Sequence, residues 1–430
     1  MYFQKDIETM PRGEIERLQL ERLRRIVDYC RDNVPFYRER LDAAGVTGDR
    51  IKCLSDVQYI PLTTKADIRD NYPYGLFAVP MKKIVRIHAS SGTTGKPTVV
   101  GYTRGDVDRW SDCVARLAAA VGVTDDDVAQ ISFGYGLFTG ALGLHYGLEK
   151  LGCAVIPVSS GNTEKQVMLL RDFGTTVLIS TPSYAMYMSE VARSEGISPE
   201  ELPLRIGLFG SEGCTDELRD KIEAGFGLFS TDNYGMSELM GPGVAGECEH
   251  RCGLHFAEDH FLPEIIDPAT GEVLPEGESG ELVVTTLTKE GIPLLRYRTR
   301  DITQITREAC ACGRTHARMA KVRGRSDDML KIRGVNVFPS QIESVIASVE
   351  GASPHYELIL TRENYTDFLE VKVEFTDAAL LEDYRLLEAL REKIADKLHT
   401  VLGIKAKVVL APPNSLKRYE GKAKRIIDNR

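Results

Sequence analysis

The sequence predicts an α/β protein with a large N-terminal body and a small α+β domain at its C-terminal end. Three changes of pattern along the chain support this. From about residue 84 to residue 210, short β-rich runs alternate with longer helical stretches, which is typical of a parallel sheet with helices in its connections. After residue 240, strand-like runs alternate with Gly/Pro turns, and from about residue 327 a short mixture of helices and strands follows.

The composition is that of a globular protein with a sizeable core. Of the 430 residues, 43% are hydrophobic and 27% are charged, which excludes a disordered, collagen-like or coiled-coil chain. The net charge of −9 argues against a nucleic-acid partner. There is no apolar run of 18 residues and no signal-peptide pattern, so we expect no membrane partner and a cytoplasmic location.

The first expected element is a helix over residues 13–45, interrupted at Pro35 and Phe36. Its apolar positions recur at spacings of three and four among Arg and Glu: Leu18, Leu20, Leu23, Ile26 and Val27.

Alternating strands and helices are expected next. The predicted strands are Ile84–Ile87, Val128–Ser132, Ala154–Val158, Thr176–Ser180 and Arg205–Phe209. The predicted helices are Arg104–Val121, Thr139–Leu151, Glu164–Phe173 and Tyr184–Glu195. Ligands of such folds bind at the carboxyl ends of the strands, so the loops there are the first place to look for chemistry.

The remainder divides into a β-rich part and a C-terminal domain. Strands at His260–Ile266 and Gly280–Thr286, separated by turns, predict a mostly antiparallel unit. In the C-terminal part we expect a helix after Pro339, strands at about 357–360, 369–375 and 406–410, and a helix at about 378–401. The predicted domains are therefore 1–326, including a β-rich appendix at about 240–320, and 327–430.

Five motifs carry the candidate chemistry. The first is SSGTTGK at Ser90–Lys96, where hydroxyls and backbone N–H groups between glycines can surround an anion. Only two residues separate Gly92 from Gly95, and Pro97 follows the lysine, so this is not a Walker P-loop. The alternative is an ordinary flexible loop.

The second motif is YGMSE at Tyr234–Glu238, which is expected to follow an apparent strand, and the third is YRTRD at Tyr297–Asp301. In the second, a tyrosine before glycine offers a flat face for stacking, and Glu238 can hold Mg²⁺. The alternative is a solvated carboxylate. In the third, an aspartate that closes a strand can accept two ribose hydroxyls. The alternative is a surface ion pair with Arg298 or Arg300.

The last two motifs lie in the C-terminal part. GRSDDMLKIRGVNVFP at residues 324–339 occupies the junction of the two large pieces, where a linker is expected. GKAKR follows at Gly421–Arg425, where the glycine lets the ammonium of Lys422 reach inward. A solvated basic tail is the alternative for this last motif.

In order and content these motifs resemble the adenylate-forming superfamily of acyl- and aryl-CoA synthetases, and within it the phenylacetate-CoA ligase family. The resemblance extends to ETMPR at 8–12, NVPFY at 33–37 and GVNVFPSQIE at 334–343. It implies an adenylate-forming domain with a small mobile C-terminal domain. The implied activity joins an aryl acid to CoA through an aryl-adenylate, consuming ATP with Mg²⁺. The alternative is an enzyme that loads a carrier-protein thiol or another acceptor. A homodimer is the assembly we consider.

The resemblance also implies roles for matched positions. Lys422 would be the catalytic lysine, because an ammonium stabilises the charge that builds when a carboxylate attacks the α-phosphate. Lys424 is the neighbouring alternative. Glu238 would hold Mg²⁺ and Asp327 would be the hinge. ATP or AMP would be bound by Ser90, Ser91, Gly92, Thr93, Thr94, Gly95, Lys96, Glu212, Asn233, Tyr234, Gly235, Met236, Ser237, Asp301 and Arg325.

The acyl pocket implied by the resemblance contains aromatic residues flanked by glycines, a composition that suits a flat ring better than a long alkyl chain. We favour phenylacetate, with benzoate-like, hydroxyphenyl and indolyl acids as rivals. The alternative for each residue is ordinary core. The pocket residues are Tyr135, Phe138, Ala141, Gly210, Ser211, Gly235 and Met236.

Four of the nine cysteines fall in two close pairs, which predicts a metal site. Thiolates with an imidazole suit tetrahedral Zn²⁺ of the closed, structural kind. The resemblance favours the ligand set Cys248, His255, Cys310 and Cys312. Cys252 is the rival of His255, and His250 and His316 are further candidates. The alternative is a group of reduced thiols without metal.

Overall fold

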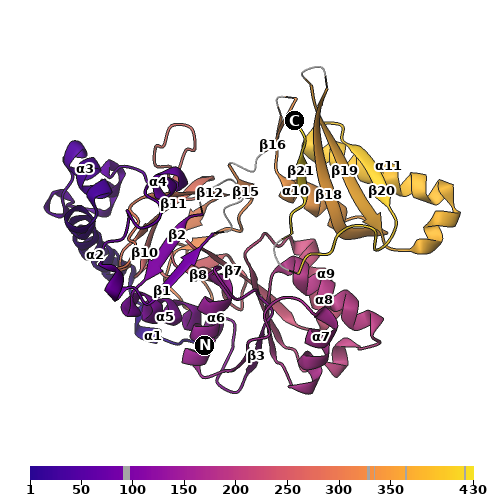
Figure 1. Cartoon of the computed structure of the whole chain (residues 1–430), viewed down its shortest axis with the longest axis horizontal. Helices are drawn as coiled ribbons and strands as arrows, with labels where there is room; N and C mark the ends of the chain where they lie inside the picture. Colours follow the sequence, from indigo (N-terminus) through magenta and orange to yellow (C-terminus); the bar gives the residue numbers. More distant parts are fainter. Residues whose placement is uncertain (91–96, 327–329, 334, 364–365, 421–422) are drawn as a thin grey trace. The chain divides into compact units, whose positions relative to one another are not determined.

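In the computed structural model the chain forms two compact units (Figure 1). The structure describes residues 1–90, 97–326, 330–333, 335–363, 366–420 and 423–430. Unit 1 consists of Met1–Ser180, Leu202–Ser211 and Phe229–Val322, and unit 2 of Thr181–Glu201, Glu212–Leu228 and Arg323–Arg430. The predicted division of the chain after residue 326 stays a prediction.

Unit 1 begins with α1 (Lys5–Glu8), α2 (Arg12–Asn33) and α3 (Pro35–Ala44). The interruption expected at Pro35 and Phe36 lies one residue earlier, at Val34, and Pro35 begins the second helix. A proline disfavours helical dihedrals in the residue before it, and Val34 is extended at φ −122° and ψ 108°. Short helices follow: η1 (Gly48–Arg50), η2 (Leu54–Tyr59), α4 (Lys65–Asp70) and η3 (Met81–Lys83).

A nine-stranded mixed sheet forms the centre of unit 1, in the order β13-β14-β9-β8-β7-β6-β5-β3-β4. The strands from β4 to β7 are parallel, and those from β7 to β13 are antiparallel. The parallel strands are β3 (Val128–Ile131), β4 (Ala154–Ile156), β5 (Val177–Ser180), β6 (Ile206–Gly210) and β7 (Phe229–Met236). The antiparallel ones are β8 (Gly241–Glu247), β9 (Leu254–Phe256), β13 (Ile305–Thr306) and β14 (Arg318–Met319).

The β-rich part of the sequence is shared between this sheet and a second one. β10 (Phe261–Ile266), β11 (Gly280–Thr286) and β12 (Tyr297–Thr303) are consecutive antiparallel strands of the second sheet. A separate hairpin pairs β1 (Arg86–Ala89) with β2 (Val99–Tyr102). β1 therefore starts two residues later than the predicted strand at Ile84.

Helices α5 (Arg104–Ala120), α6 (Gly140–Leu151) and α7 (Thr163–Asp172) complete unit 1. Glycines in β8 let α5 approach closely: a Cβ on Gly246 would lie 1.8 Å from Leu117 Cδ1. The buried core runs through the sheet and its helices and includes Trp110, Tyr102 and Phe256. No helix in the described part of the chain has the length and apolar character needed to cross a membrane.

Unit 2 contains a four-stranded sheet in the order β20-β19-β18-β21. Its strands are β18 (Ala352–Glu363), β19 (Thr366–Phe375), β20 (Lys407–Ala411) and β21 (Ile426–Asp428). The long helix predicted from residue 378 begins later, because η5 (Ala378–Glu382) precedes it and the Asp383 side chain caps α11 (Tyr384–Leu402). The other elements are α8 (Pro182–Ser194), η4 (Pro199–Glu201), α9 (Asp216–Phe226), β15 (Gly324–Arg325), β16 (Leu330–Ile332), β17 (Val335–Val337) and α10 (Pro339–Ala347). Of these, α8 and α10 were predicted, and the others were not.

Candidate active site

The β1–β2 hairpin holds the two ends of the hydroxyl-rich motif together. The Ser90 hydroxyl accepts hydrogen bonds from the Thr98 backbone N–H at 3.0 Å and from the Thr98 hydroxyl at 2.7 Å. The Ser90 N–H donates to the Thr98 carbonyl at 3.0 Å. The other motif positions, Ser91 to Lys96, lie outside the described residues. The structure therefore defines the neck of this motif, by which we mean the hydrogen-bonded pair Ser90 and Thr98 on its two sides.

Glu238 of the second motif lies beside that neck. Its Oε1 accepts a hydrogen bond from the Thr98 hydroxyl at 3.3 Å and lies 3.4 Å from Lys65 Nζ. Glu238 is only 4% exposed, so the alternative of a solvated carboxylate is wrong. Thr98 thus connects the first motif to the second, a link that no sequence pattern indicated.

The turn that follows β7 is held by buried side-chain donors. The hydroxyl of Tyr102 donates to the carbonyls of Ser237 at 3.3 Å and Met240 at 3.1 Å. The ammonium of Lys289 donates to the carbonyl of Glu238 at 3.0 Å. Tyr102 in turn stacks on Trp110 with ring centroids 5.0 Å apart. The backbone around Glu238 is therefore held by three hydrogen bonds from buried side chains.

The second and third motifs meet through one hydrogen bond. The Tyr234 hydroxyl donates to Asp301 Oδ2 at 2.6 Å, and Asp301 is 6% exposed. Two expectations need correction: Tyr234 belongs to β7 itself, and Asp301 lies inside β12 instead of closing the strand. Arg298 and Arg300 pair with Glu281, so neither forms the ion pair with Asp301 that was the alternative.

The end of β6, which pairs with β7, brings three further predicted residues together. Asn233 is buried, and its Nδ2 donates to the Phe209 carbonyl at 2.6 Å. A Cβ on Gly210 would lie 2.5 Å from the Asn233 carbonyl oxygen, so a larger residue at this position would separate the two strands. Ser211 follows with φ of 73°, which turns the chain away from the sheet.

Tyr135, Phe138 and Ala141 of the predicted acyl pocket lie between β3 and the first turn of α6. The Tyr135 hydroxyl is 3.0 Å from His145 Nδ1, and burial raises the pKa of this tyrosine. Ala141 is fully buried, whereas Phe138 is 55% exposed. A cavity of about 340 Å³ lies nearby in the chain but contains none of the predicted pocket residues; it is lined by Val158, Ser160, Gly161, Asn162, Lys165, Gln166 and Leu169.

Four predicted residues belong to the C-terminal part of the chain or to unit 2. Glu212 accepts hydrogen bonds from the backbone N–H of Ser183 at 2.7 Å and of Ala423 at 3.3 Å, all within unit 2. Arg325 lies in β15 of the same unit. Asp327 and Lys422 are outside the described residues.

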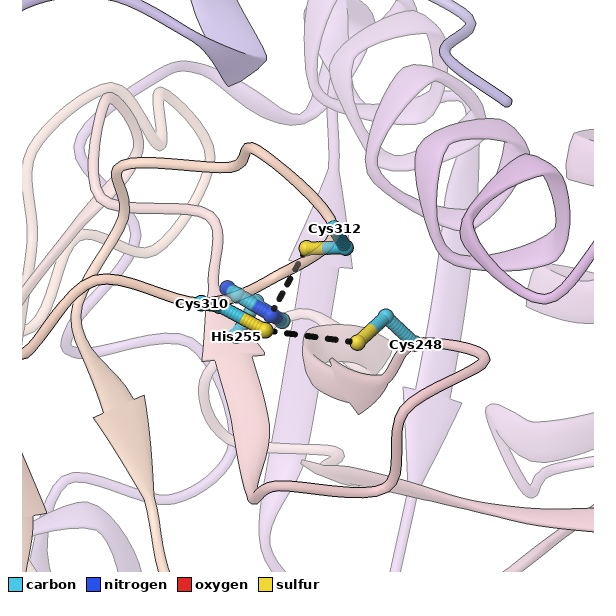
Figure 2. A group of neighbouring side chains, drawn as sticks. All are labelled: Cys248, His255, Cys310 and Cys312. Carbon is cyan, nitrogen blue, oxygen red and sulfur yellow. Dashed lines mark hydrogen bonds between the residues drawn. The ribbon is translucent and has the colours of Figure 1, made fainter.

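The predicted metal ligands form a compact cluster in unit 1 (Figure 2). One ligand atom each from Cys248, His255, Cys310 and Cys312 lies within 4.8 Å of all the others. Cys248 Sγ and Cys310 Sγ are 3.7 Å apart, and Cys312 Sγ and His255 Nε2 are 3.5 Å apart. A tetrahedral Zn²⁺ with standard bond lengths separates two sulfurs by about 3.8 Å and a sulfur from a nitrogen by about 3.6 Å. Both observed distances fit that geometry.

The remaining candidates lie outside the cluster. Cys252 is exposed, and its thiol donates to the His250 carbonyl at 3.2 Å. His316 uses both ring nitrogens on backbone carbonyls, those of Phe256 at 2.8 Å and Ile7 at 3.1 Å. The cluster contains His255 and none of its rivals Cys252, His250 and His316, so the geometry favours His255. A hydrogen bond with Cys248, and then one with His255, lowers the pKa of Cys312, which favours its thiolate.

The loop that carries Cys312 is also a docking point for the first residues of the chain. The Tyr2 hydroxyl donates to the Cys312 carbonyl at 2.6 Å, and the Arg314 guanidinium lies 2.7 Å from the Glu8 carboxylate. The Thr315 N–H donates to the Glu8 carbonyl at 3.1 Å. Residues 2–8 and 312–315 thus form one packed layer.

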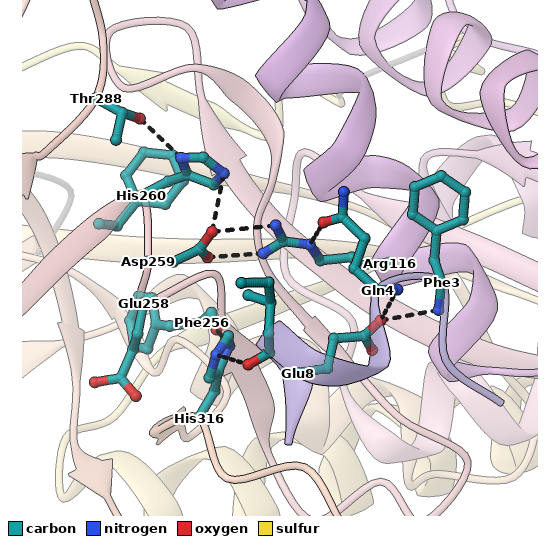
Figure 3. A network of polar contacts seen from close by, with 12 residues as sticks. Phe3, Gln4, Glu8, Arg116, Phe256, Glu258, Asp259, His260, Thr288 and His316 are labelled. Atoms are coloured by element: carbon teal, nitrogen blue, oxygen red, sulfur yellow. Dashed lines mark hydrogen bonds and ion pairs between the residues drawn. The ribbon is translucent and has the colours of Figure 1, made fainter. Parts of the chain in front are cut away.

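A buried network of charges lies between this layer and the strand that leads to Lys289 (Figure 3). Arg116 binds Asp259 through two hydrogen bonds of 2.7 and 3.1 Å. His260 Nε2 lies 3.1 Å from the Asp259 carboxylate, and its Nδ1 lies 2.8 Å from the Thr288 hydroxyl. Thr288 is the residue before Lys289, so the network reaches the loop whose Lys289 donates to the Glu238 carbonyl. Neither Lys289 nor Thr288 was singled out from the sequence, because both lie outside every motif.

Comparisons with family models and with known proteins all identify the same family of enzymes. Residues 16–288 match the family model of the AMP-binding enzymes, and residues 334–430 match that of the AMP-binding enzyme C-terminal domain. The chain is 50% identical to the phenylacetate-coenzyme A ligase of Thermus thermophilus, covering 100% of both chains. It is 48% identical to the phenylacetate-coenzyme A ligase of Escherichia coli, covering 99% of this chain and 97% of that one.

A solved structure of 2-hydroxyisobutyryl-CoA ligase in complex with 2-HIB-AMP is similar in fold. It matches with a TM-score of 0.94 at 30% identity, over 100% of this chain and 92% of that chain.

Proposed function

The chain belongs to the phenylacetate-coenzyme A ligase family of AMP-binding enzymes, and we propose that it is an ATP-dependent aryl-CoA ligase whose acid is phenylacetate. The observation that carries this proposal is the convergence of three separate motifs in unit 1. The Thr98 hydroxyl contacts both Ser90 and Glu238, and Tyr234 of the same motif as Glu238 contacts Asp301.

The proposed reaction has two steps. An oxygen of the aryl carboxylate attacks the α-phosphate of ATP, the bond to pyrophosphate breaks, and aryl-AMP forms. The CoA thiol then loses its proton and attacks the acyl carbon, and AMP leaves with the bonding electrons. Hydroxide is too poor a leaving group for direct thioester formation, which is why the acid is first joined to AMP.

Each motif has a role in binding the nucleotide. The residues of the β1–β2 loop surround the β- and γ-phosphates, Tyr234 flanks the adenine, and Asp301 accepts the ribose hydroxyls. The carboxylate of Glu238 fits Mg²⁺, because Oε1 is engaged by Thr98 and Lys65 while Oε2 has no donor among the described residues. Bound there, Mg²⁺ neutralises charge on the phosphates.

Lys422 is the proposed catalytic lysine of the first step. Replacing it by alanine should lower pyrophosphate release by about 10²–10³-fold, the usual cost of losing one electrostatic stabiliser. Thioester formation from synthetic phenylacetyl-AMP and CoA should persist. Lys424→Ala is the matched control and should leave both steps unchanged. Equal loss of both steps in the Lys422 variant would contradict the assignment.

The substrate is tested by measuring AMP release with a panel of aryl and aliphatic acids in the presence of CoA. We expect phenylacetate to exceed benzoate in kcat/KM by roughly 10–200-fold, the range for one methylene in an apolar pocket. A carrier protein in place of CoA tests the alternative acceptor. Faster release with the carrier protein, or with aliphatic acids, would overturn the proposed activity.

We also propose that Cys248, His255, Cys310 and Cys312 hold a structural Zn²⁺. The ligand spacing and the burial of three of the four residues support it. Protein purified without added metal should contain about one zinc per chain by elemental analysis. Cys310→Ser should lose it, and Cys252→Ser should keep it. Substoichiometric zinc, with all thiols open to titration, would contradict the site.

A cytoplasmic location is part of the same proposal, supported by nine cysteines of which none forms a disulfide. The homodimer, the Asp327 hinge and the absence of nucleic-acid and membrane partners stay predictions.

A further inference from the structure

We propose that Lys289 is a positioning residue for the adenylation step, a role that rests on the proposed function. Its buried ammonium fixes the backbone of Glu238 and so aims the carboxylate that is proposed to hold Mg²⁺. The ammonium does not act on the substrate itself.

The position of Lys289 is unusual for a lysine. Its side chain is 0% exposed, although lysines are almost never fully buried unless they are paired. Within the described part of the chain, no carboxylate lies within ion-pair distance of its ammonium. Nζ donates instead to the neutral carbonyl of Glu238 at 3.0 Å and lies 5.0 Å from the centre of the Tyr102 ring. The charge is thus directed at one backbone group.

Burial makes this arrangement costly for the fold. Desolvation lowers the pKa of Lys289 to about 8, and Asp106 and Glu238 oppose that shift only in part. A methionine has nearly the same length and shape and would fill the space without a charge. Packing alone therefore does not explain why this residue is a lysine. The explanation that remains is the hydrogen bond from its ammonium to the Glu238 carbonyl.

The backbone on either side of Lys289 is rigidly held. The N–H groups of Glu290 and Gly291 donate to the two oxygens of Asp106 at 2.7 and 2.8 Å. On the other side, the Thr288 hydroxyl lies against His260 (Figure 3). A lysine on such a base can hold its partner in a fixed place, because little of its own backbone freedom remains.

Three carbonyls of the turn at residues 237–240 are divided between two donors. Tyr102 binds those of Ser237 and Met240, and among the described residues only Lys289 binds that of Glu238. Tyr102→Phe is therefore a matched control, since it loosens the same turn without touching the Glu238 carbonyl.

The test compares Lys289→Met, Tyr102→Phe and the wild-type protein in ATP–pyrophosphate exchange and in thioester formation from synthetic phenylacetyl-AMP. We expect Lys289→Met to unfold at a temperature no lower than the wild type, because replacing a buried charge by an apolar group of similar volume is often neutral or stabilising. Its KM for MgATP should rise at least tenfold, while the KM for phenylacetate and the thioester step stay within twofold. Tyr102→Phe should shift the MgATP KM less.

Two results would overturn the proposal: an unchanged MgATP KM in the folded variant, or equal loss of both steps in proportion to unfolded protein. If Lys289→Met does not fold, Lys289→Gln takes its place with the same expected split. The absence of any aryl-acid-dependent exchange in the wild type would instead refute the proposed function.

Discussion

Two of the buried cations of unit 1, Arg116 and Lys289, are held in opposite ways. Arg116 binds both oxygens of Asp259, and the planar guanidinium matches the carboxylate. Burial alone lowers the pKa of Arg116, but Asp259 outweighs burial and raises it above the usual value. Lys289 donates to one neutral carbonyl, and burial lowers its pKa to about 8.

The difference shows how a buried charge can be interpreted. A charge that is fully paired contributes to the fold only as long as its partner remains, so breaking the pair should destabilise the protein. A charge without an opposite partner weakens the fold, so removing it should cost function before stability. The predictions below test this contrast between Arg116 and Lys289.

The largest effect is expected from Asp259→Asn. This change leaves the Arg116 guanidinium buried without a counter-charge, which typically costs about 3–5 kcal/mol. Urea denaturation should show this loss in the free energy of unfolding, while Lys289→Met shows none. A loss below 1 kcal/mol in the Asp259 variant would mean that the two cations do not differ in the way proposed.

His260 should make the Arg116 network sensitive to acid. Burial lowers its pKa to about 4, against the opposing effect of Asp259, so between pH 6.5 and about pH 4 the unfolded chain binds a proton that the native state does not. The free energy of unfolding should therefore fall as the pH drops through that window, by at most about 3 kcal/mol at 1.36 kcal/mol per pKa unit.

Denaturation curves at pH 6.5, 5 and 4 measure this slope, and His260→Gln should flatten it. An equal slope in the variant would show that other groups cause the acid sensitivity.

The smallest effect is expected from Thr288→Val. Thr288 contacts His260 of the Arg116 network and is the residue before Lys289, so it connects the two regions. The change leaves the buried Nδ1 of His260 without its partner and should cost about 1–3 kcal/mol. The KM for MgATP should change much less than in Lys289→Met. A comparable change in that KM would mean that stiffness of the loop, and not the ammonium of Lys289, orients Glu238.

Local patterns in the sequence were enough to predict most helices and strands. The alternation of strands and helices from β3 to β6 was predicted because each of these strands is a short run of apolar residues that is recognisable by itself. The pairing of β9 with β14 was not predicted, because it joins residues 254–255 to 318–319 and no local pattern records such a contact. For the same reason, the β-rich part was not expected to extend the parallel sheet.

Residues of the candidate site that stand in sequence motifs could be predicted. Residues that belong to it only through contacts in the folded chain could not. Tyr234, Glu238 and Asp301 stand in short motifs, so their involvement could be inferred before their geometry. Thr98 and Lys289 touch Glu238 from 140 and 51 residues away and carry no motif of their own. The choice of His255 over Cys252, His250 and His316 likewise needed distances, because the sequence offers more candidate ligands than a tetrahedral site has places.

The layer formed by residues 2–8 and 312–315 has a consequence for biosynthesis. The ion pair between Glu8 and Arg314 spans 306 positions of the chain. At translation speeds of 5–20 residues per second, the early segment must wait on the ribosome for roughly 15–60 s before its partner has been made. During that interval a nascent chain carries this segment undocked, where chaperones and proteases can reach it.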